Sequence, residues 1–574
     1  MSNRSVLILL LVSSLSAGAH AAGKSKLTAL GTTSFKSAAS AAALAGPNLD
    51  REDTNDRSRE NAHRQALGKF AADRRAKMSA AAKALAPTTI PHLSSMDIAE
   101  TNHGAFGFAG LSNFQSAAVN HGFSTEPPDQ ALCVGNGFVL EGVNSALAVY
   151  DEHGNLMAGP VGNNDFFQDP QNVSDPRCLY DSATDRWFIT LIDYPNTFDN
   201  NGILIAVSVN GDPTGSYNVY RLDVTGDGDA GDCPCLGDQP LIGADRNAYV
   251  VTTNAFGVFT FDGAQVYAFS KAALAAGSAS VAFRHFGNLS AQLPGVEFAF
   301  SINPSITPPG DPGDKGTEWL AQSLGALPIE NGLGVWAMSD TANIDSNPAA
   351  MTMNVQVVST QSYAGPNPAT QKAGPTPLAE LAEARGVPGD DSEQRLDGDD
   401  VRMQQVTFVG GRLYAALGTA AVTPGSPLID AAAWFAIDVK NTANGPTGTV
   451  AAQGYVAGPN SSSVIYPALT VNSLGQAAMV FTLTGPSFFP SAAYWRMGGR
   501  SIHLLEDGAA PQDGFSAYYF ARPRWGDYSA ATVGADGSLW IATELVPGGA
   551  RKRFANWGTF IGRLRTHPEE GDDD

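Results

Sequence analysis

The sequence predicts an all-β chain folded as a seven-bladed β-propeller. Residues 175–223 contain four short β-rich runs, at 177–180, 186–193, 203–209 and 216–222, separated by Asp, Asn, Gly and Pro. Such breaks favour turns, and four antiparallel strands of this size make one propeller blade. Similar units recur along the chain. A composition of 61 Gly and 35 Pro with only 16% charged residues suits many strands joined by tight turns.

The repeated unit opens with Asp or Asn, often near Pro, and continues into a small, apolar strand. Successive openings are about 66 residues apart on average, and a second β-rich run follows each of them. Seven units predict seven blades, with six or eight as alternatives. The openings are Asp129, Asp175, Asp238, Asn303, Asp400, Tyr466 and Asp527.

The chain divides into four segments. Residues 1–21 are typical of a signal peptide, with Arg4, an apolar core at 6–15 and a small-x-small cleavage site at 19–21. Residues 22–104 form an Ala-rich leader, expected to be partly helical or disordered and to supply no core element, because it lacks an apolar face. The propeller is expected over 105–566, with a Pro/Ala/Gly-rich insertion at 362–398, and an acidic tail follows at 567–574. Residues 106–118 are the candidate strand that closes the ring.

The charge balance limits the classes of partner. The formal net charge is −21 and the pI about 4.7, which excludes a nucleic-acid partner because phosphate binding needs a basic surface. No apolar run reaches the length of about 18 residues that a membrane span needs. We therefore expect a soluble, monomeric, exported protein, located in the periplasm or outside the cell.

Four cysteines, an even number in an exported chain, favour two disulfides. They are Cys133, Cys178, Cys233 and Cys235, and they allow three pairings. Cys133–Cys178 is favoured because both lie at the same position of successive units, which leaves Cys233–Cys235 as a tight ring. A metal site at the latter pair is the weaker interpretation, since no nearby His or second Cys pair completes a tetrahedral set.

The repeated acidic openings form a candidate binding site. The first strand of each blade lines the central channel, so equivalent positions form a ring at one mouth. Like charges there raise one another's pKa unless a cation or hydrogen-bond donors neutralise them. The functional interpretation is that the ring holds Ca²⁺ or another cation, or binds a substrate. The favoured interpretation is that each Asp caps a turn by accepting hydrogen bonds from backbone N–H groups. Its members are Asp129, Asp175, Arg177, Asp238, Asp400, Arg402 and Asp527.

A second acidic loop carries Asp227, Asp229 and Asp232 between glycines. Alternating carboxylates can wrap one hard cation, although the bidentate Glu of a full EF-hand loop is missing. A solvated acidic turn is the alternative. Ca²⁺ is the only cofactor that the sequence indicates, and no motif for a nucleotide or an organic cofactor is present.

Catalytic motifs are sparse. The histidines of residues 105–566 show no metal-binding spacing, and there is no GxSxG elbow or P-loop. Asp399 and Asp400 with Arg402, or Asp527 with Glu544, could serve acid–base chemistry. An ion pair and a turn cap explain them better.

Several motifs resemble a known group of proteins. Residues 127–144 (PPDQALCVGNGFVLEGVN) and 524–545 (RWGDYSAATVGADGSLWIATEL) resemble segments of a widespread group of secreted bacterial and fungal propeller proteins. Residues 207–217 (VSVNGDPTGSY) resemble a degenerate Asp-box, the structural turn of sialidases. The resemblance implies the fold and export but no mechanism. The three arginines of a sialidase have possible counterparts in Arg177, Arg402 and Arg524, but the Phe-Arg-Ile-Pro motif is missing.

Two functions follow from these patterns. The first is a binding or scaffold propeller that recognises a polysaccharide or an extracellular protein through loops at one face. Bound calcium could stabilise such a propeller. The alternative is a carbohydrate-active hydrolase or lyase with an axial site. Such an enzyme needs two carboxylates about 5–10 Å apart in a pocket, or an arginine cluster. Since no catalytic pair stands out from the turn aspartates, the binding function is favoured.

Overall fold

The structure is a computed structural model. It describes residues 25–45, parts of 66–77, 87–99, 105–122, 125–195, 199–229, 231, 233–257, 260–295, 297–325, 327–378, 395–514, 524–548 and 554–565. The predicted signal peptide and acidic tail lie outside these residues.

Most of the described chain is β-structure, with 54% strand and 9% helix. Consecutive strands pair antiparallel in sets of four, and seven such sets follow one another along the described chain. The first three sets are β4 (Ala131–Gly135), β5 (Phe138–Val143), β6 (Ala146–Asp151) and β7 (Leu156–Gly162); β8 (Asn172–Asp181), β9 (Arg186–Tyr194), β10 (Gly202–Ser208) and β11 (Ser216–Asp223); and β12 (Leu236–Ala244), β13 (Ala248–Phe256), β14 (Phe261–Ser270) and β15 (Phe283–Phe286).

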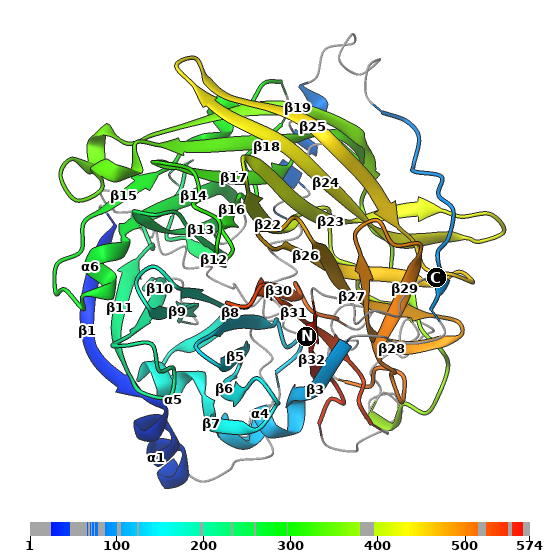
Figure 1. The fold of residues 1–574 in the computed structure, drawn as a ribbon, viewed down its shortest axis with the longest axis horizontal. Coiled ribbons are helices and arrows are strands. Elements are labelled where there is room, and N and C mark those ends of the chain that lie inside the picture. The colour runs from blue at the N-terminus through cyan, green and yellow to red at the C-terminus, as the bar shows by residue number, and fades with distance from the viewer. Residues whose placement is uncertain are drawn as a thin grey trace, which may run out of the picture.

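The remaining four sets are β16 (Asn303–Ile306), β17 (Thr317–Ser323), β18 (Ile329–Ser339) and β19 (Thr352–Ala364); β22 (Met403–Val409), β23 (Arg412–Val422), β24 (Leu428–Thr442) and β25 (Gly445–Val456); β26 (Ser463–Val471), β27 (Ala477–Gly485), β28 (Phe488–Arg496) and β29 (Ser501–Glu506); and β30 (Ala530–Val533), β31 (Leu539–Leu545), β32 (Gly558–Leu564) and β3 (Ala105–Ser112). Short parallel pairings of β16 with β12 and β22 join the third, fourth and fifth sets. Figure 1 shows the first strands β8, β12, β22, β26 and β30 nearer the middle of the molecule than the last strands β11, β15, β25 and β29 of other sets.

The hydrophobic core is divided among the spaces between neighbouring sets. Cys133 and Leu140 of the first set pack with Trp187 and Ile189 of the second. Equivalent clusters fill each following space, and the last cluster packs the seventh set against the first. Strands covered on both faces need continuous apolar runs, which explains why their sequences alternate poorly.

The seventh set takes its outer strand from the N-terminal part of the chain. β3 pairs antiparallel with β32, with Ala105 opposite Leu564 and Ala109 opposite Phe560. The prediction that residues 106–118 pair with the last strand is confirmed for the part that forms β3. The helix α4 (Asn113–Val119) follows, and its N-terminus is closed by a capping box between Ser112 and Gln115.

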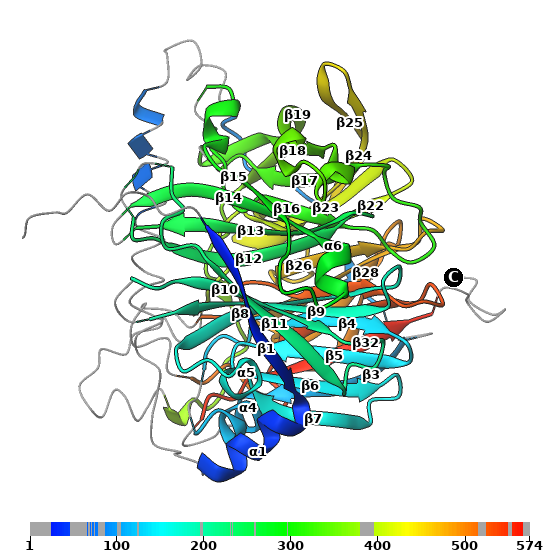
Figure 2. The same ribbon diagram turned by 90° about the vertical axis from the view of Figure 1, so that its left-hand side faces the viewer.

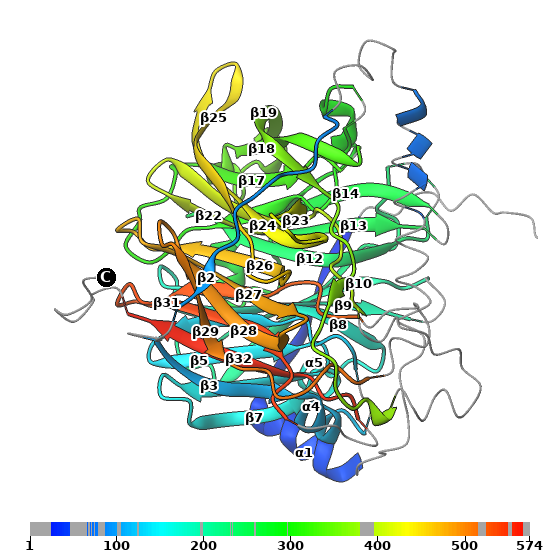
Figure 3. The same ribbon diagram turned by 90° about the vertical axis from the view of Figure 1, so that its right-hand side faces the viewer.

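The predicted leader departs from expectation, because it does supply structural elements. β1 (Lys26–Ser34) pairs along the whole of β11 and extends the second set to five strands (Figure 2). β2 (Asp97–Ile98) pairs with β29 of the sixth set (Figure 3). Most residues of β1 are exposed. Backbone hydrogen bonds at a sheet edge therefore hold this strand, and they leave no apolar pattern in the sequence.

Side chains of the leader also enter the core. Phe35, the first residue of α1 (Phe35–Ala45), is buried, and its ring centroid lies 5.1 Å from that of Phe166 in α5 (Asn163–Phe167). Farther along, the Phe70 ring lies 5.2 Å from Phe261 and 5.0 Å from Phe298. The expectation of a leader without core elements is therefore wrong for these segments.

The turn at residues 207–217 has the structure that its Asp-box resemblance implies. Asp212 Oδ1 accepts hydrogen bonds from Thr214 N at 2.9 Å and Thr214 Oγ1 at 2.7 Å. The buried Tyr217 ring packs beneath, and its hydroxyl donates to Pro213 O at 2.8 Å. These contacts are internal to the turn and shape a hairpin.

The predicted insertion at 362–398 contains the end of β19 and a two-stranded ladder of β20 (Ala369–Thr370) and β21 (Arg395–Leu396). In the part of the chain that the structure describes, no helix combines the length and apolarity needed to cross a bilayer.

Candidate functional site

One residue at or near the start of the first strand of every set has a left-handed backbone. Their φ angles lie between +44° and +61°, a region that non-glycine residues seldom adopt. In β8, β12 and β26 this residue falls within a β-bulge, which turns the strand where it enters the sheet. All seven positions lie within two residues of the openings predicted from the sequence. They are Asp129, Asp175, Gln239, Ser301, Asp399, Tyr466 and Gly526.

Hydrogen bonds between these openings link one set to the next. Asp129 Oδ1 accepts from Asp527 N at 2.6 Å, which ties the seventh set to the first. Asn144 Nδ2 donates to Asp129 Oδ2 at 2.7 Å, and Asn144 Oδ1 accepts from Asp175 N at 2.8 Å, which ties the first set to the second. Asp175 Oδ2 in turn accepts from Gln239 N of the third set at 3.2 Å. The acidic openings therefore bind backbone N–H groups of the neighbouring sheet.

Two arginines lie beside Asp527. Arg524 Nη2 is 2.7 Å from Asp527 Oδ1, and both side chains are buried. The Arg177 guanidinium stacks on the ring of Tyr528 at 3.2 Å from its centroid, and the Tyr528 hydroxyl donates to Pro176 O at 2.8 Å. Cation–π stacking and the nearby carboxylates stabilise the Arg177 charge against the burial that lowers its pKa.

The third arginine, Arg402, is held by its own loop. Its Nε lies 2.9 Å from Asp399 Oδ2, and its Nη2 donates to Asp400 Oδ2 at 2.9 Å. Asp527 also stabilises the Arg402 charge across the axis. The structure thus brings Arg177, Arg402 and Arg524 within electrostatic reach of one carboxylate, as their places near strand openings suggested.

Two carboxyl groups here favour the protonated form. Burial raises the pKa of Asp129 well above its usual value, and the charges of Asp527 and Asp175 raise it further. Burial likewise raises the pKa of Glu544, with added repulsion from Asp129 and Glu126.

A small cavity of about 40 Å³ lies between the first strands of the sets. Its lining includes Gln130, Arg177 and Gln404. Gln130 Nε2, Gln130 Oε1, Arg177 Nε and Gln404 Oε1 have no hydrogen-bond partner among the residues that the structure describes. Buried polar atoms of this kind are satisfied by water, and the cavity has room for a few water molecules. Sites that enclose an organic ligand are about 300–1,000 Å³, so this cavity is too small for a sugar.

The predicted ring is therefore assembled in part. Asp129, Asp175, Arg177, Arg402 and Asp527 interact with one another or with a shared partner. Asp238 lies on β12 opposite Asn254, and Gln239 takes the left-handed position instead. Asp400 is partly exposed and holds Arg402, while Asp399 takes the left-handed position.

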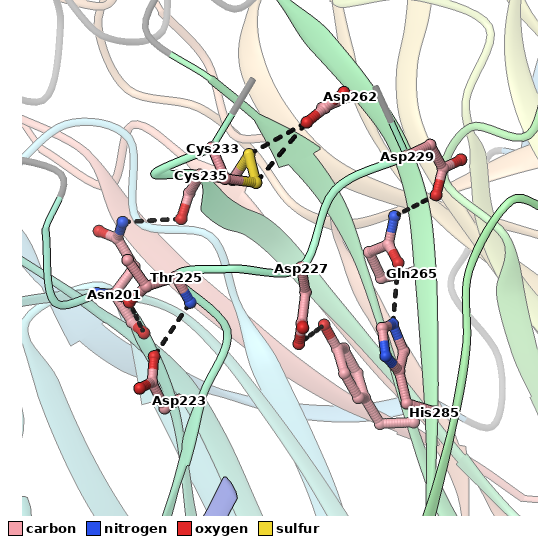
Figure 4. The surroundings of a disulfide bond; sticks show 11 residues. Asn201, Asp223, Thr225, Asp227, Asp229, Cys233, Cys235, Asp262, Gln265 and His285 are labelled. Carbon is pink, nitrogen blue, oxygen red and sulfur yellow. Dashed lines mark hydrogen bonds between the residues drawn. A yellow bond between two sulfur atoms is a disulfide. The ribbon is translucent and has the colours of Figure 1, made fainter. Parts of the chain in front are cut away.

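The second acidic loop does not gather its carboxylates in one place (Figure 4). Asp227 Oδ2 accepts from Tyr267 Oη at 2.9 Å and from Ser25 Oγ at 2.6 Å. Asp229 Oδ1 accepts from Gln265 Nε2 at 2.9 Å and from Asn288 N at 2.7 Å. The third predicted ligand, Asp232, lies outside the described residues, so calcium at this loop stays a prediction.

Both predicted disulfides are present. Cys133–Cys178 joins the first two sets, and Cys233–Cys235 closes a ring with a sequence separation of 2. In the chain-entropy account, closing a loop of separation 45 contributes about 4 kcal/mol and the short ring about 1.5 kcal/mol. Cys133–Cys178 is therefore the structural cross-link of the two.

One group of potential metal ligands occurs among the described residues, formed by Cys233, Cys235 and Asp262. Its two sulfurs belong to the disulfide, so it offers no thiolate to a metal in this form. Sequence reasoning missed Asp262, Asn144 and Tyr528. Each meets its partner only across the fold, and no local motif marks such a residue.

Comparisons with known proteins give the chain no family. No family model matches it, and no curated protein does. Among solved structures, a Trypanosoma rangeli sialidase in complex with sialic acid is 10% identical with a TM-score of 0.33, and the match covers 76% of this chain and 60% of that one. A fungal alcohol oxidase of the AA5 family is 10% identical with a TM-score of 0.37, covering 76% and 74%. An α-L-arabinofuranosidase from Fusarium graminearum is 8% identical with a TM-score of 0.32, covering 77% and 94%. These likenesses are too low to carry a functional conclusion, and the chain spans less than two thirds of the sialidase.

Proposed function

We propose that the chain is an exported seven-bladed β-propeller that binds a polysaccharide or an extracellular protein through loops at one face. The blade count rests on the seven four-stranded sets and on the core clusters that pack each set against the next and the seventh against the first. Export rests on the predicted signal peptide, and two disulfides suit an oxidising compartment.

The observation that carries a binding function is the internal pairing of the axial charges. Asp129, Asp175 and Asp527 are at most 8% exposed, and each accepts hydrogen bonds from within the protein. The nearby cavity of about 40 Å³ has no room for a sugar ring. These groups therefore link neighbouring sets of strands, and this supports the proposal that recognition is made by the loops.

Calcium forms a separable part of this proposal. A cation that binds only the folded state raises stability by mass action, by about 2.7 kcal/mol at one hundred times its dissociation constant. A chelator should then lower Tm, and Asp227→Asn should abolish that response. A Tm that the chelator leaves unchanged would show that calcium does not stabilise the folded protein.

A carbohydrate-active hydrolase or lyase is the second candidate, and the pKa pattern favours it. Burial and neighbouring acidic charges raise the pKa values of Asp129 and Glu544 well above their usual range, and Asp527 pairs with Arg524. A protonated acid beside an ionised one is the arrangement that glycosidases use. Opening of this buried site would be required before a substrate could reach it.

A panel of glycans and polysaccharides, assayed in parallel for binding and for release of products, separates the two functions. The proposal predicts binding without turnover for the parent protein, with and without Ca²⁺. Turnover that Glu544→Gln abolishes while binding is retained would replace the binding function by the enzymatic one.

A further inference from the structure

The Cys233–Cys235 disulfide lies against a buried carboxyl group (Figure 4). Asp262 Oδ2 is 3.6 Å from Cys233 Sγ and 3.3 Å from Cys235 Sγ. Disulfide sulfurs carry no hydrogen, so neither can donate to this oxygen. In the dithiol form, both S–H groups are within range to donate to it. The contact with Asp262 therefore favours the reduced form over the oxidised one.

The Cys233–Cys235 disulfide contributes less to folding stability than Cys133–Cys178 does. Its two cysteines are separated by 2 residues, compared with 45 for Cys133–Cys178, and a cross-link that closes a short loop removes little entropy from the unfolded chain. The fold therefore loses little when this bond opens. A disulfide with a minor structural role and a neighbour that favours its dithiol form is suited to reversible exchange.

The two sulfurs also differ in access. Cys233 is partly exposed, next to the exposed Pro234, whereas Cys235 is fully buried. An incoming thiolate reaches Cys233 Sγ first. Cys235 is then the leaving group, and its sulfur takes up a proton from the incoming dithiol, so that the resulting S–H can donate to Asp262.

The geometry points to Cys233–Cys235 as a redox-active disulfide that exchanges with an external dithiol. A thiolate of the dithiol attacks Cys233 Sγ, a mixed disulfide forms, and the Cys233–Cys235 bond breaks. The second thiol of the partner attacks the mixed disulfide and frees Cys233. Two electrons and two protons pass from the dithiol to the cysteine pair, and the partner becomes a disulfide. Asp262 is a positioning residue, because it acts through the thiols.

Dithiothreitol added to the folded parent protein tests the exchange, with alkylation of free thiols and mapping by mass spectrometry. Cys233 and Cys235 should be alkylated at least tenfold faster than Cys133 and Cys178, while circular dichroism stays native. If both disulfides open together, or only when the protein unfolds, the proposal is wrong.

The reduction potential of the pair tests the role of Asp262. Asp262→Asn replaces a carboxyl acceptor by an amide oxygen, a weaker acceptor for the two S–H groups, so the equilibrium constant for reduction should fall about tenfold, which corresponds to about 30 mV. Asp223→Asn is the control, because it removes a nearby aspartate at the end of β11 that accepts from Thr225 N and lies apart from the sulfurs (Figure 4). A potential that shifts equally in both variants, or in neither, would overturn the role of Asp262. The alkylation experiment on the parent protein does not depend on the folding of either variant.

Discussion

Glu141 is a buried acid at the junction between the first and last sets. Its Oε2 accepts from Leu111 N of β3 at 2.9 Å and from Tyr150 Oη at 3.3 Å, and its Oε1 accepts from the Thr559 hydroxyl of β32. Burial raises the pKa of Glu141 to about 7, despite these hydrogen bonds. The residue therefore ties the closing strand to the first set in a manner that depends on pH.

We expect Glu141 to make the folded protein less stable as pH rises. Its folded-state pKa of about 7 lies above the unfolded value of 4.5, so the folded state binds this proton more tightly. The stabilisation is complete below pH 4.5 and is lost as the pH rises to about 7, a change of about 3 kcal/mol. Urea unfolding of the parent and of Glu141→Gln at several pH values measures it. The difference in unfolding free energy between the parent and Glu141→Gln should change between pH 4.5 and about 7. A difference that stays constant with pH would contradict the raised pKa of Glu141.

The disulfides give a second prediction at the scale of single residues. Replacing Cys133 and Cys178 by Ser should lower the free energy of unfolding by about 4 kcal/mol, and the same change at Cys233 and Cys235 by about 1.5 kcal/mol. Denaturant unfolding of the two double variants measures this. Equal losses of unfolding free energy in the two variants would mean that Cys233–Cys235 stabilises the fold as much as Cys133–Cys178 does.

At the scale of elements, β1 and α1 show what the sequence could not reveal. The openings of the propeller strands were predictable because turn residues and apolar runs repeat, and the left-handed residues fall within two positions of them. β1 was missed because an edge strand is held by backbone hydrogen bonds, which every residue can make. The Ala-rich sequence around Phe35 gave no periodic apolar face, although that single ring is buried.

We expect α1 to be anchored through Phe35. Phe35→Ala removes a ring that packs against Phe166 and Tyr217, which should cost about 3 kcal/mol. Leu30→Ala on β1 is the control, because Leu30 is 50% exposed and should change stability by less than about 0.5 kcal/mol. Thermal unfolding of both variants is the measurement. Similar Tm values for the two would show that the N-terminal segment is not docked.

At the scale of the whole molecule, we propose that β3 closes the ring of strand sets. A chain that starts at residue 100 keeps this strand, whereas one that starts at 113 leaves β32 as an open edge next to the first set. Both lack β1 and β2, so they differ in the closing strand and in Ser112, the N-cap of α4 at the end of that strand. The longer chain should stay monomeric and the shorter one should aggregate, as light scattering would show. Equal behaviour would contradict closure by β3.

The candidate site was predictable only in its outline. Repetition placed Asp129, Asp175 and Asp527 at equivalent openings, and the favoured interpretation as caps agrees with their bonds to backbone N–H groups. Their pairing with Asn144, Arg524 and each other depends on the curvature that brings the seventh set back to the first. Local sequence does not encode that curvature, so which charges meet could not be predicted.

The central claim is our proposal that the buried charges around Asp129, Asp175 and Asp527 join neighbouring sets of strands. A comparison of two ion pairs tests it most directly. Arg524–Asp527 is buried, with side chains 6% and 9% exposed, whereas Arg412–Asp438 is a surface pair at 38% and 57%. Removing one partner of a buried pair costs about 3–5 kcal/mol, and breaking a surface pair about 0–1 kcal/mol.

The measurement is urea unfolding of Arg524→Gln and Arg412→Gln at neutral pH, with ligand binding and turnover assayed on the folded fractions. We predict that Arg524→Gln loses several kcal/mol of stability and that Arg412→Gln stays within about 1 kcal/mol of the parent. An Arg524→Gln protein as stable as the parent that has lost turnover would show instead that the axial charges act on a substrate.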